Sequence, residues 1–378
     1  MSRASLSCDL DEFRQLVEVD VEMSDYPRAR GLASGAIEYA GDCFDATDEG
    51  ELEALRVELA AALLDGPGIV VIRGAFDRDV VDRVSEVFTE IIREQRTSGA
   101  AAGDHFATAG ANDRIWNSLE KLALRDPAAF VAYHDNPAID ITSLAWLGPS
   151  YQLTAQVNVV NPGGAAQSAH RDYHLGFMSR DVAASYPRHA HRLSPVLTLQ
   201  GAVAHSEMRA DTGPTMYLPH SQKYEAGYLA WHRPEFQDYF DQRRSQPELG
   251  LGDAVFFNPA LFHAAGANRT SDVHRMANLL QVSSAFGRAM ESVDRRAMVE
   301  ALYPVLLAQR DAGRTDAGLR RVVAASAEGY AFPADLDHDQ PVEGMTPDSM
   351  ADIVWSCLLG GASAAGLASA LDERFGAR

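Results

Sequence analysis

Apolar residues in the first part of the chain recur at helical spacing. A helix is predicted from 52 to 65, because apolar side chains repeat there every three or four positions and a Gly-Pro-Gly turn follows. The apolar run at 69–72 predicts a short strand, and Asp77 is placed to cap a second amphipathic helix. Residues 1–45 show little periodicity, which predicts a loosely structured arm. The Gly/Ala-rich segment 98–114 predicts a loop.

Polar and apolar residues alternate strictly in the middle of the chain. From 152 to 159 every even position is polar and every odd position is apolar, which predicts a strand with one polar face. The polar positions are Gln152, Thr154, Gln156 and Asn158. Such a face is solvated on an ordinary sandwich strand but lines a polar cavity in a barrel. The pattern leaves both alternatives open.

Further short strands are predicted in the centre of the chain, at 196–204, 215–218, 253–258 and 276–283. Turn signals rather than helices separate them, which favours an antiparallel sandwich or jelly roll over βαβ units. After Gly287 the pattern becomes helical again, with Thr315 as a candidate cap. We therefore expect a mainly β core with N-terminal flanking helices. The expected segments are an arm at 1–45, a core domain at 46–286 and a helical extension at 287–378.

The amino-acid composition argues against some classes of binding partner. The chain has 33 basic and 53 acidic residues, a formal net charge of −20, which repels phosphate backbones and anionic lipids. Nucleic acid and membrane surfaces are therefore not expected as partners. Three scattered cysteines without a CxxC pattern argue against a disulfide scaffold or a structural zinc site, and favour a reducing cytoplasm. No apolar run follows the basic N-terminal residue, so a secretory signal is not expected.

One C-terminal stretch, 353–371, contains 19 residues without a charge. It could be interpreted as a membrane anchor, but Gly360-Gly361 interrupts it. Thr346 and Pro347 are placed to open a helix before this pair, and Ser363 to cap a second helix after it. We therefore expect a helical hairpin rather than a membrane span.

The main candidate for chemistry is His170-Arg171-Asp172. In a strand, residues i and i+2 share a face, so both ligand side chains could meet one metal ion. A third ligand must come from elsewhere, and His263 lies 91 residues beyond Asp172 (263 − 172). Two imidazoles and one carboxylate form the facial triad of non-haem iron(II) oxygenases, which leaves open positions for a co-substrate and oxygen.

The His-x-acid tripeptide alone has no specificity. Twelve histidines and 53 acidic residues among 378 give about 1.7 matches by chance (12 × 53/378), and the chain has two. The second, His205-Ser206-Glu207, ends an apolar strand and is expected to belong to the core. His170 instead follows a polar-faced strand and a glycine-rich turn, which favours it as the metal site.

Three longer runs carry a resemblance to a known family. QSAHRDYHLGF (167–177), TGPTMYLPHSQK (212–223) and LGDAVFFNPALFHAAGANRTSDVHR (251–275) resemble the phytanoyl-CoA dioxygenase family, and the similarity spans about 50–286 in the right order. The resemblance implies a double-stranded β-helix, a jelly-roll and cupin-like fold. It also implies an enzyme, a dioxygenase that uses Fe(II), 2-oxoglutarate and O2.

The resemblance also assigns roles to residues. It implies that His170, Asp172 and His263 are catalytic and bind the iron. The family places an arginine about a dozen residues after the distal histidine to hold the distal carboxylate of 2-oxoglutarate. Arg275 matches, twelve residues on, and a guanidinium suits the task because its planar fork pairs with both carboxylate oxygens. Arg269 is the competing position.

Other polar side chains have weaker assignments. Gln156 and Thr215 are candidate contacts to the co-substrate or substrate, against the alternative of cavity lining without a defined role. His174 shares parity with the metal ligands and could face the same cavity. The basic cluster 188–192 is either a solvated loop or a recognition site for a substrate carboxylate. The tryptophans are expected in the core: Trp116, Trp146 and Trp231.

The resulting hypothesis is a 2-oxoglutarate-dependent dioxygenase that hydroxylates an unactivated C–H bond of a small molecule, with release of succinate and CO2. A small polar metabolite or natural-product intermediate is expected as substrate, because an acyl-CoA thioester would face the acidic protein. Two alternatives remain: a non-catalytic metal-binding β-helix protein, and a cupin-type metal enzyme independent of 2-oxoglutarate. The C-terminal extension is expected either to shape the pocket or to form a homodimer interface.

Overall fold

A large sheet forms the centre of the molecule. The computed structural model describes residues 6–99, 111–335, 337 and 345–376. Eight strands pair in the order β1-β2-β3-β8-β6-β10-β5-β4, and all the neighbouring pairs are antiparallel except β2–β3. The strands are β1 (Gly31–Ala33), β2 (Ala36–Ala40), β3 (Ile69–Arg73), β4 (Asn112–Ile115), β5 (Gln152–Val160), β6 (Thr198–Ala204), β8 (Ala254–Phe257) and β10 (Arg275–Ser283).

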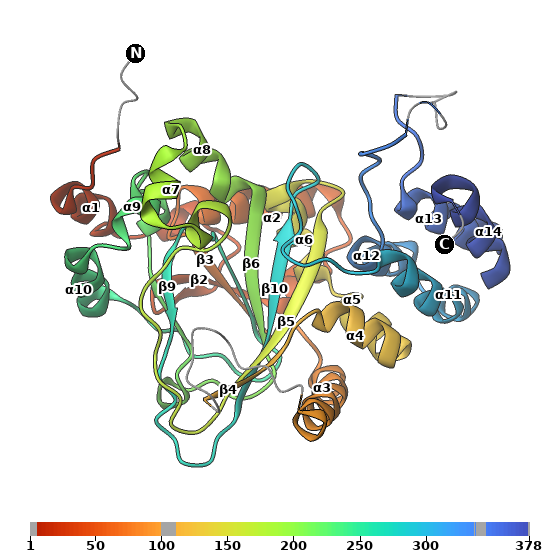
Figure 1. Ribbon diagram of the computed structural model, residues 1–378, viewed down its shortest axis with the longest axis horizontal. Coiled ribbons are helices and arrows are strands. Elements are labelled where there is room, and N and C mark those ends of the chain that lie inside the picture. Colours follow the sequence, from red (N-terminus) through yellow and green to blue (C-terminus); the bar gives the residue numbers. More distant parts are fainter. Residues whose placement is uncertain (1–5, 100–110, 336, 338–344, 377–378) are drawn as a thin grey trace.

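A second, smaller sheet provides the other wall of the site. It consists of β7 (Thr215–Leu218) and β9 (Phe262–Ala265), paired antiparallel. One cavity is lined by residues of both sheets, so the site lies between them. In Figure 1, β9 lies on the left of the large sheet, across from β6, β10 and β5.

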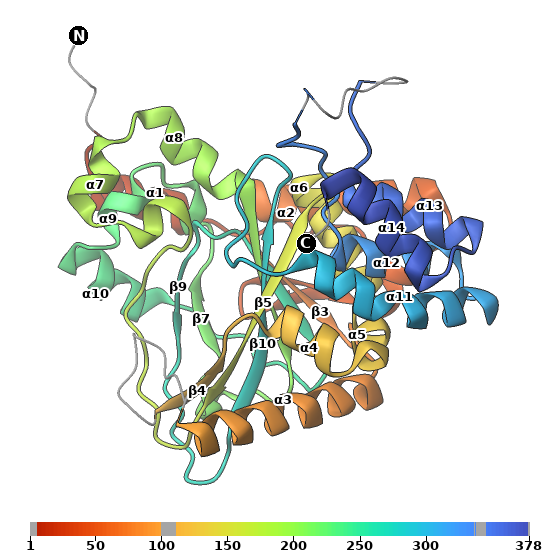
Figure 2. The ribbon, with the colours of Figure 1, turned by 45° about the vertical axis from the view of Figure 1, so that its right-hand side comes forward.

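Helices cover the face of the large sheet that points away from β9. Figures 1 and 2 show α4, α5, α11 and α12 beside β5 and β10 on that side. The helices are α1 (Leu10–Val17), α2 (Glu49–Leu64), α3 (Arg78–Ser98), α4 (Ser118–Arg125), α5 (Pro127–His134), α6 (Pro137–Leu147), α7 (Arg180–Ser185), α8 (Arg188–Leu193), α9 (Gly227–Ala230), α10 (Pro234–Arg243), α11 (Arg295–Asp311), α12 (Asp316–Ser326), α13 (Met350–Gly360) and α14 (Ala364–Phe375).

The alternation along β5 separates the core from the cavity. The odd, apolar positions 153–159 are buried in the main hydrophobic cluster together with side chains of α2 to α6 and α11 to α14. On the even face, Gln156 and Asn158 line the cavity, and Thr154 is fully buried and donates to the Gln281 carbonyl. Of the two alternatives for this polar face, the structure therefore has the cavity.

The predicted fold class is right in part. A large, mostly antiparallel sheet with flanking helices is consistent with a cupin-like fold, but 49% of the described residues are helical, so "mainly β" is not confirmed. The predicted helices near 52–65 and after Asp77 and the strand at 69–72 are present as α2, α3 and β3. The division at residues 45 and 286 stays a prediction.

The expectation of a loose N-terminal arm is wrong for residues 6–45. β2 pairs in parallel with β3, which adds this segment to the large sheet. Asp9 caps α1, and Phe13 of that helix is buried among the aromatic rings of a second cluster. Elements of three to eight residues are too short to produce a clear periodicity, which is why the pattern did not reveal them.

The loop predicted at 98–114 is only partly testable, because 100–110 lie outside the described residues. At its end, Asn112–Ile115 forms β4, which pairs with β5. The sequence Asn-Asp-Arg-Ile has low strand propensity and lies at the sheet edge, so neighbouring β5 rather than local preference makes it a strand.

The C-terminal uncharged stretch folds as the expected hairpin of α13 and α14. Gly361 adopts a left-handed conformation (φ 69°) that ends α13, and Ser363 caps α14. Ser349, rather than Thr346, caps α13, with a capping box to Asp352. Within the part of the chain that is described, no helix has both the length and the apolar character needed to cross a membrane.

A buried carboxylate ties α12 to α5. Asp135 directly follows α5, and its side chain is 8% exposed. It accepts from Arg314 Nε at 2.6 Å and from Arg321 Nε at 2.7 Å. Two guanidinium groups thus compensate one carboxylate, and the C-terminal helices are joined electrostatically as well as by apolar packing.

We predict that Asp135→Asn lowers the free energy of unfolding by about 2 kcal/mol. Breaking a fully buried pair costs about 3–5 kcal/mol. The effect is smaller here because Arg314 and Arg321 are 32% and 20% exposed. Urea denaturation measures this change. The matched control is Asp11→Asn, which removes an exposed pair with Arg14 and should cost less than about 0.5 kcal/mol. Equal effects of the two substitutions would contradict the account.

Candidate metal centre and active-site cavity

The cavity between the sheets has a volume of about 650 Å³. The residues that the sequence favoured for iron or co-substrate contact all line it: Gln156, His170, Asp172, Thr215, His263 and Arg275. They come from β5, from the segment before α7, and from β7, β9 and β10. The fold therefore brings together side chains up to 119 positions apart (275 − 156).

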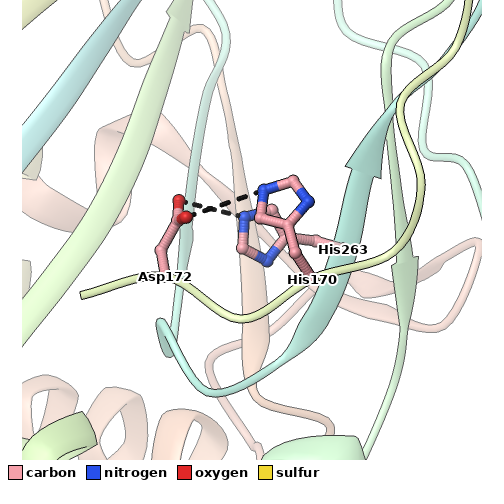
Figure 3. Close-up of side chains that lie close together, drawn as sticks. All are labelled: His170, Asp172 and His263. Atoms are coloured by element: carbon pink, nitrogen blue, oxygen red, sulfur yellow. Dashed lines mark hydrogen bonds and ion pairs between the residues drawn. The ribbon is translucent and has the colours of Figure 1, made fainter. Parts of the chain in front are cut away.

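The three predicted metal ligands converge. One ligand atom from each of His170, Asp172 and His263 lies within 4.8 Å of the others. His263 Nε2 is 3.3 Å from Asp172 Oδ2, and His170 Nε2 is 3.6 Å from Asp172 Oδ1. Figure 3 shows both imidazole rings and the carboxylate pointing toward one another.

A hydrogen bond at Nδ1 orients each of the two imidazole rings. Nδ1 of His170 is 2.9 Å from the Ser168 carbonyl, and Nδ1 of His263 is 2.8 Å from the Leu261 carbonyl. A carbonyl only accepts, so each Nδ1 must carry a proton, and Nε2 is the nitrogen that faces the carboxylate. With both Nε2 atoms deprotonated, the three side chains would form a donor set of two imidazoles and one carboxylate, which fits ferrous iron.

A short backbone bridge sets the register of the two histidines. The His170 N–H donates to the His263 carbonyl at 2.9 Å, and the His263 N–H donates back at 3.1 Å. The expectation that His170 and Asp172 lie in one strand is wrong, because only this isolated bridge forms. Instead, the Asp172 N–H donates to the Pro259 carbonyl at 3.1 Å, which holds the segment against the turn before β9.

Arg171 anchors the same segment from behind. Its guanidinium is fully buried, donates to the Ser221 and Tyr224 carbonyls, and lies over the ring of Phe262 at 5.2 Å. A Cβ at Gly227 would lie 1.9 Å from the guanidinium carbon, so a larger residue there would displace the guanidinium. Arg171 points into the core, and the residues on either side of it, His170 and Asp172, face the cavity.

The site favours the ionised form of Asp172. Burial alone would raise the pKa of this carboxyl, but the charge of His170 and the hydrogen bond and charge of His263 outweigh it, aided by a hydrogen bond from Gln200. The pKa is therefore held below its usual range. The carboxylate is thus charged and ready for a metal throughout the neutral range.

Arg275, the candidate anchor for 2-oxoglutarate, lines the same cavity as the three candidate metal ligands. It opens β10, is 4% exposed, and burial lowers its pKa to about 10. It donates to the Gly213 carbonyl, and its buried Nε has no hydrogen-bond partner among the described residues. A dicarboxylate reaching this end of the cavity would satisfy that donor. Arg269, the competing position, does not line the cavity.

Several weaker expectations are corrected. His174 is absent from the cavity lining, because positive φ angles at Tyr173 and His174 break the strand parity, and its Nδ1 contacts Ser194 Oγ at 3.1 Å. Trp116 and Trp231, expected in the core, line the cavity.

The basic cluster 188–192 forms helix α8 rather than a loop. Arg188 and Arg192 both pair with Glu225, so their charges are already compensated, and His191 is buried. This pairing does not favour the cluster as a recognition site for a substrate carboxylate.

His205, the second histidine of a His-x-acid tripeptide, is a core residue as expected. Tyr133 Oη lies 2.8 Å from its Nε2, and Ser85 Oγ lies 2.8 Å from its Nδ1. Ser85 also donates to the Val81 carbonyl, so Nδ1 of the neutral imidazole donates to Ser85 while Tyr133 donates to Nε2. Both nitrogens are used, and Glu207 pairs instead with Arg78 at the surface.

Most of the other lining residues were not singled out from the sequence, among them Gln200, Arg114 and Phe177. Gln200 Nε2 donates to Asp172 Oδ2 at 2.5 Å. It is the one polar residue between Leu199 and Ala204 of an otherwise apolar strand. A buried amide in such a strand needs a partner, so this interruption was the available signal.

Known proteins similar to this chain include the family that the sequence motifs resemble. The family model for phytanoyl-CoA dioxygenase (PhyH) matches residues 64–277, more than half of the chain. The chain belongs to the phytanoyl-CoA dioxygenase family. It is 25% identical over 265 residues to the dioxygenase cdmD of Talaromyces verruculosus, covering 65% of this chain and 80% of that one. It is also 25% identical over 282 residues to the dioxygenase olcK of Penicillium canescens, covering 69% and 83%.

Among solved structures, the chain is similar to the non-haem α-ketoglutarate-dependent epimerase SnoN from nogalamycin biosynthesis. The sequence identity is 20%, the TM-score is 0.44, and the match covers 63% of this chain and 82% of that one. As a member of its family, the present protein is a non-haem dioxygenase that uses Fe(II), 2-oxoglutarate and O2.

We predict that acid destabilises the protein partly through His205, whose pKa burial lowers to about 3. In the unfolded chain His205 becomes protonated near pH 6.5, but in the folded protein only near pH 3. Its contribution to the free energy of unfolding is therefore fully present above pH 6.5 and is lost as the pH falls toward 3. This residue contributes up to about 1.4 kcal/mol per pH unit in that window. Urea titrations from pH 7 to 4 should show a shallower decline in His205→Gln. An unchanged slope would refute the assignment.

Proposed function

We propose that this dioxygenase oxidises a C–H bond of a predominantly apolar small molecule. His170, Asp172 and His263 would hold the iron, and Arg275 would hold the distal carboxylate of 2-oxoglutarate. The observation that carries this proposal is the shared cavity. Three converging metal-type ligands and a buried guanidinium with an unused donor all line it.

The protein side chains act mainly by positioning the iron and the co-substrate. When bound, iron, 2-oxoglutarate and O2 supply the oxidising power, 2-oxoglutarate becoming succinate and CO2 while the second oxygen atom is available for the substrate. The carbonyls of Ser168 and Leu261 fix both imidazoles, and the fork of Arg275 fixes the co-substrate. The walls of the two sheets limit the access of water to the reacting centre.

Hydroxylation is the proposed outcome. The similar solved structures include an epimerase and a carbocyclase, both non-haem and α-ketoglutarate-dependent. Those two proteins thus use the same co-substrate for different reactions. Which product forms here depends on how the cavity presents the substrate carbon.

The lining supports an apolar substrate rather than the small polar metabolite expected from the net charge. Apolar side chains form most of the wall, with aromatic rings among them: Trp116, Phe177, Met178, Ala202, Met208, Tyr217, Trp231, Leu249, Val255, Phe257, Ala277, Leu279 and Met290. Phe177 and Met290 are 51% and 36% exposed, so the apolar lining reaches the surface. A cavity of about 650 Å³ lies within the size range of sites for drug-sized ligands.

We predict that anaerobic addition of Fe(II) and 2-oxoglutarate produces the visible metal-to-ligand charge-transfer band, and that air then releases succinate. Asp172→Ala should lose both signals, because it removes one of three ligands. His174→Ala, outside the cavity, should keep both. A wild-type protein that binds both ligands but releases no succinate with any substrate would support the non-catalytic alternative. Activity without 2-oxoglutarate would support the cupin-type alternative.

We predict that Arg275→Gln weakens 2-oxoglutarate binding about 10- to 100-fold, since hydrogen bonds to charged groups contribute about 1.5–3 kcal/mol. The charge-transfer band, titrated with 2-oxoglutarate at saturating Fe(II), measures the Kd. Affinity for Fe(II) itself should not change. Arg269→Gln is the matched control and should leave both constants unaltered. If Arg269→Gln were the variant that lost 2-oxoglutarate, the anchor would be misassigned.

A further inference from the structure

The local backbone around Asp172 does not fix the orientation of the Asp172 carboxylate. The residue is outside any helix or strand, and its described backbone contacts are its N–H to the Pro259 carbonyl and a long bond from Tyr228 Oη to its carbonyl at 3.5 Å. The terminal torsion of an aspartate is soft, so the plane of the carboxylate is not fixed by rotamer preference. A metal ligand in this position needs an external hydrogen bond to set the plane.

Gln200 supplies such a bond from a rigid element. It lies on β6, which is paired with β8 on one side and β10 on the other, and its Cα partners are Phe257 and Gln281. The side chain is 5% exposed. Its Nε2 is 2.5 Å from Asp172 Oδ2, the same oxygen that lies 3.3 Å from His263 Nε2.

The chemistry of the pair fixes the orientation of the amide. An ionised carboxylate only accepts, so the NH2 group of Gln200 must face Asp172 and the carbonyl Oε1 must point elsewhere. Oε1 is buried without a partner among the described residues, and Gln200 lines the cavity. The amide thus holds the carboxylate with one end and offers an acceptor to cavity occupants with the other.

We propose that Gln200 is a positioning residue for the metal centre: it fixes the plane of the Asp172 carboxylate so that the aspartate presents one geometry to the ion. This inference rests on the proposed role of Asp172 as a metal ligand. Residues that orient ligands from behind typically contribute about 10- to 100-fold to metal affinity.

The test is equilibrium binding of Co(II), an oxygen-stable probe whose visible bands report coordination geometry, to the full-length protein. Gln200→Met keeps the length of the side chain but removes the donor. Gln200→Asn keeps the amide but is one methylene too short to reach Asp172. Both should weaken Co(II) binding about 10- to 100-fold and alter its visible spectrum. Gln152→Met is the matched control and should change neither, because this β5 glutamine does not line the cavity and donates to the Ser284 and Gly287 carbonyls.

Thermal melting of each apo variant separates loss of fold from loss of positioning. Native-like melting with weakened Co(II) binding supports the proposal, and an unchanged affinity and spectrum in Gln200→Asn and Gln200→Met overturns it. If one variant fails to fold, the other decides. Failure of the wild-type protein to bind Co(II) at all would instead refute the proposed function. The two failures are therefore distinguishable.

Discussion

The candidate site depends on one pair of backbone hydrogen bonds. The bridge between His170 and His263 joins two segments separated by 93 positions (263 − 170) and brings their imidazoles side by side, with ring centroids 4.5 Å apart. Because a bridge fixes register, a shift of one residue would turn one imidazole away from the cavity. Arg171, buried behind the bridge, and the Pro259 carbonyl hold the segment so that Asp172 completes the cluster.

Around this bridge, the two sheets form a cavity in which some polar groups are left unsatisfied. Arg275 Nε and Gln200 Oε1 are buried without partners among the residues described. An unsatisfied buried group costs about 1–3 kcal/mol, so such groups are expected where a ligand will satisfy them. The apolar core on the other face of the large sheet, shared with the C-terminal helices, supplies the stability that offsets this cost.

Alternation of period two predicted β5 and its polar face, but left open whether that face lines a cavity. Short runs between turn signals predicted β6, β7, β8 and β10 but not β9. The family resemblance directed attention to His170, Asp172, His263 and Arg275. Local signals could not show β4 or the N-terminal strands, which form because a neighbouring strand pairs with them. Strand parity also failed beyond Asp172, where the chain turns through positive φ angles at Tyr173 and His174. Gln200 emerged only from the three-dimensional contact with Asp172, since a lone glutamine in an apolar strand specifies no partner.

The central claim is that His170, Asp172 and His263 share one metal ion. Anomalous diffraction from crystals grown anaerobically with Fe(II) tests it most directly, because the iron signal locates the ion without reference to activity. The account predicts a single strong peak bonded to Nε2 of both histidines and to a carboxylate oxygen of Asp172. A peak elsewhere, or one that omits any of these three side chains, would contradict it.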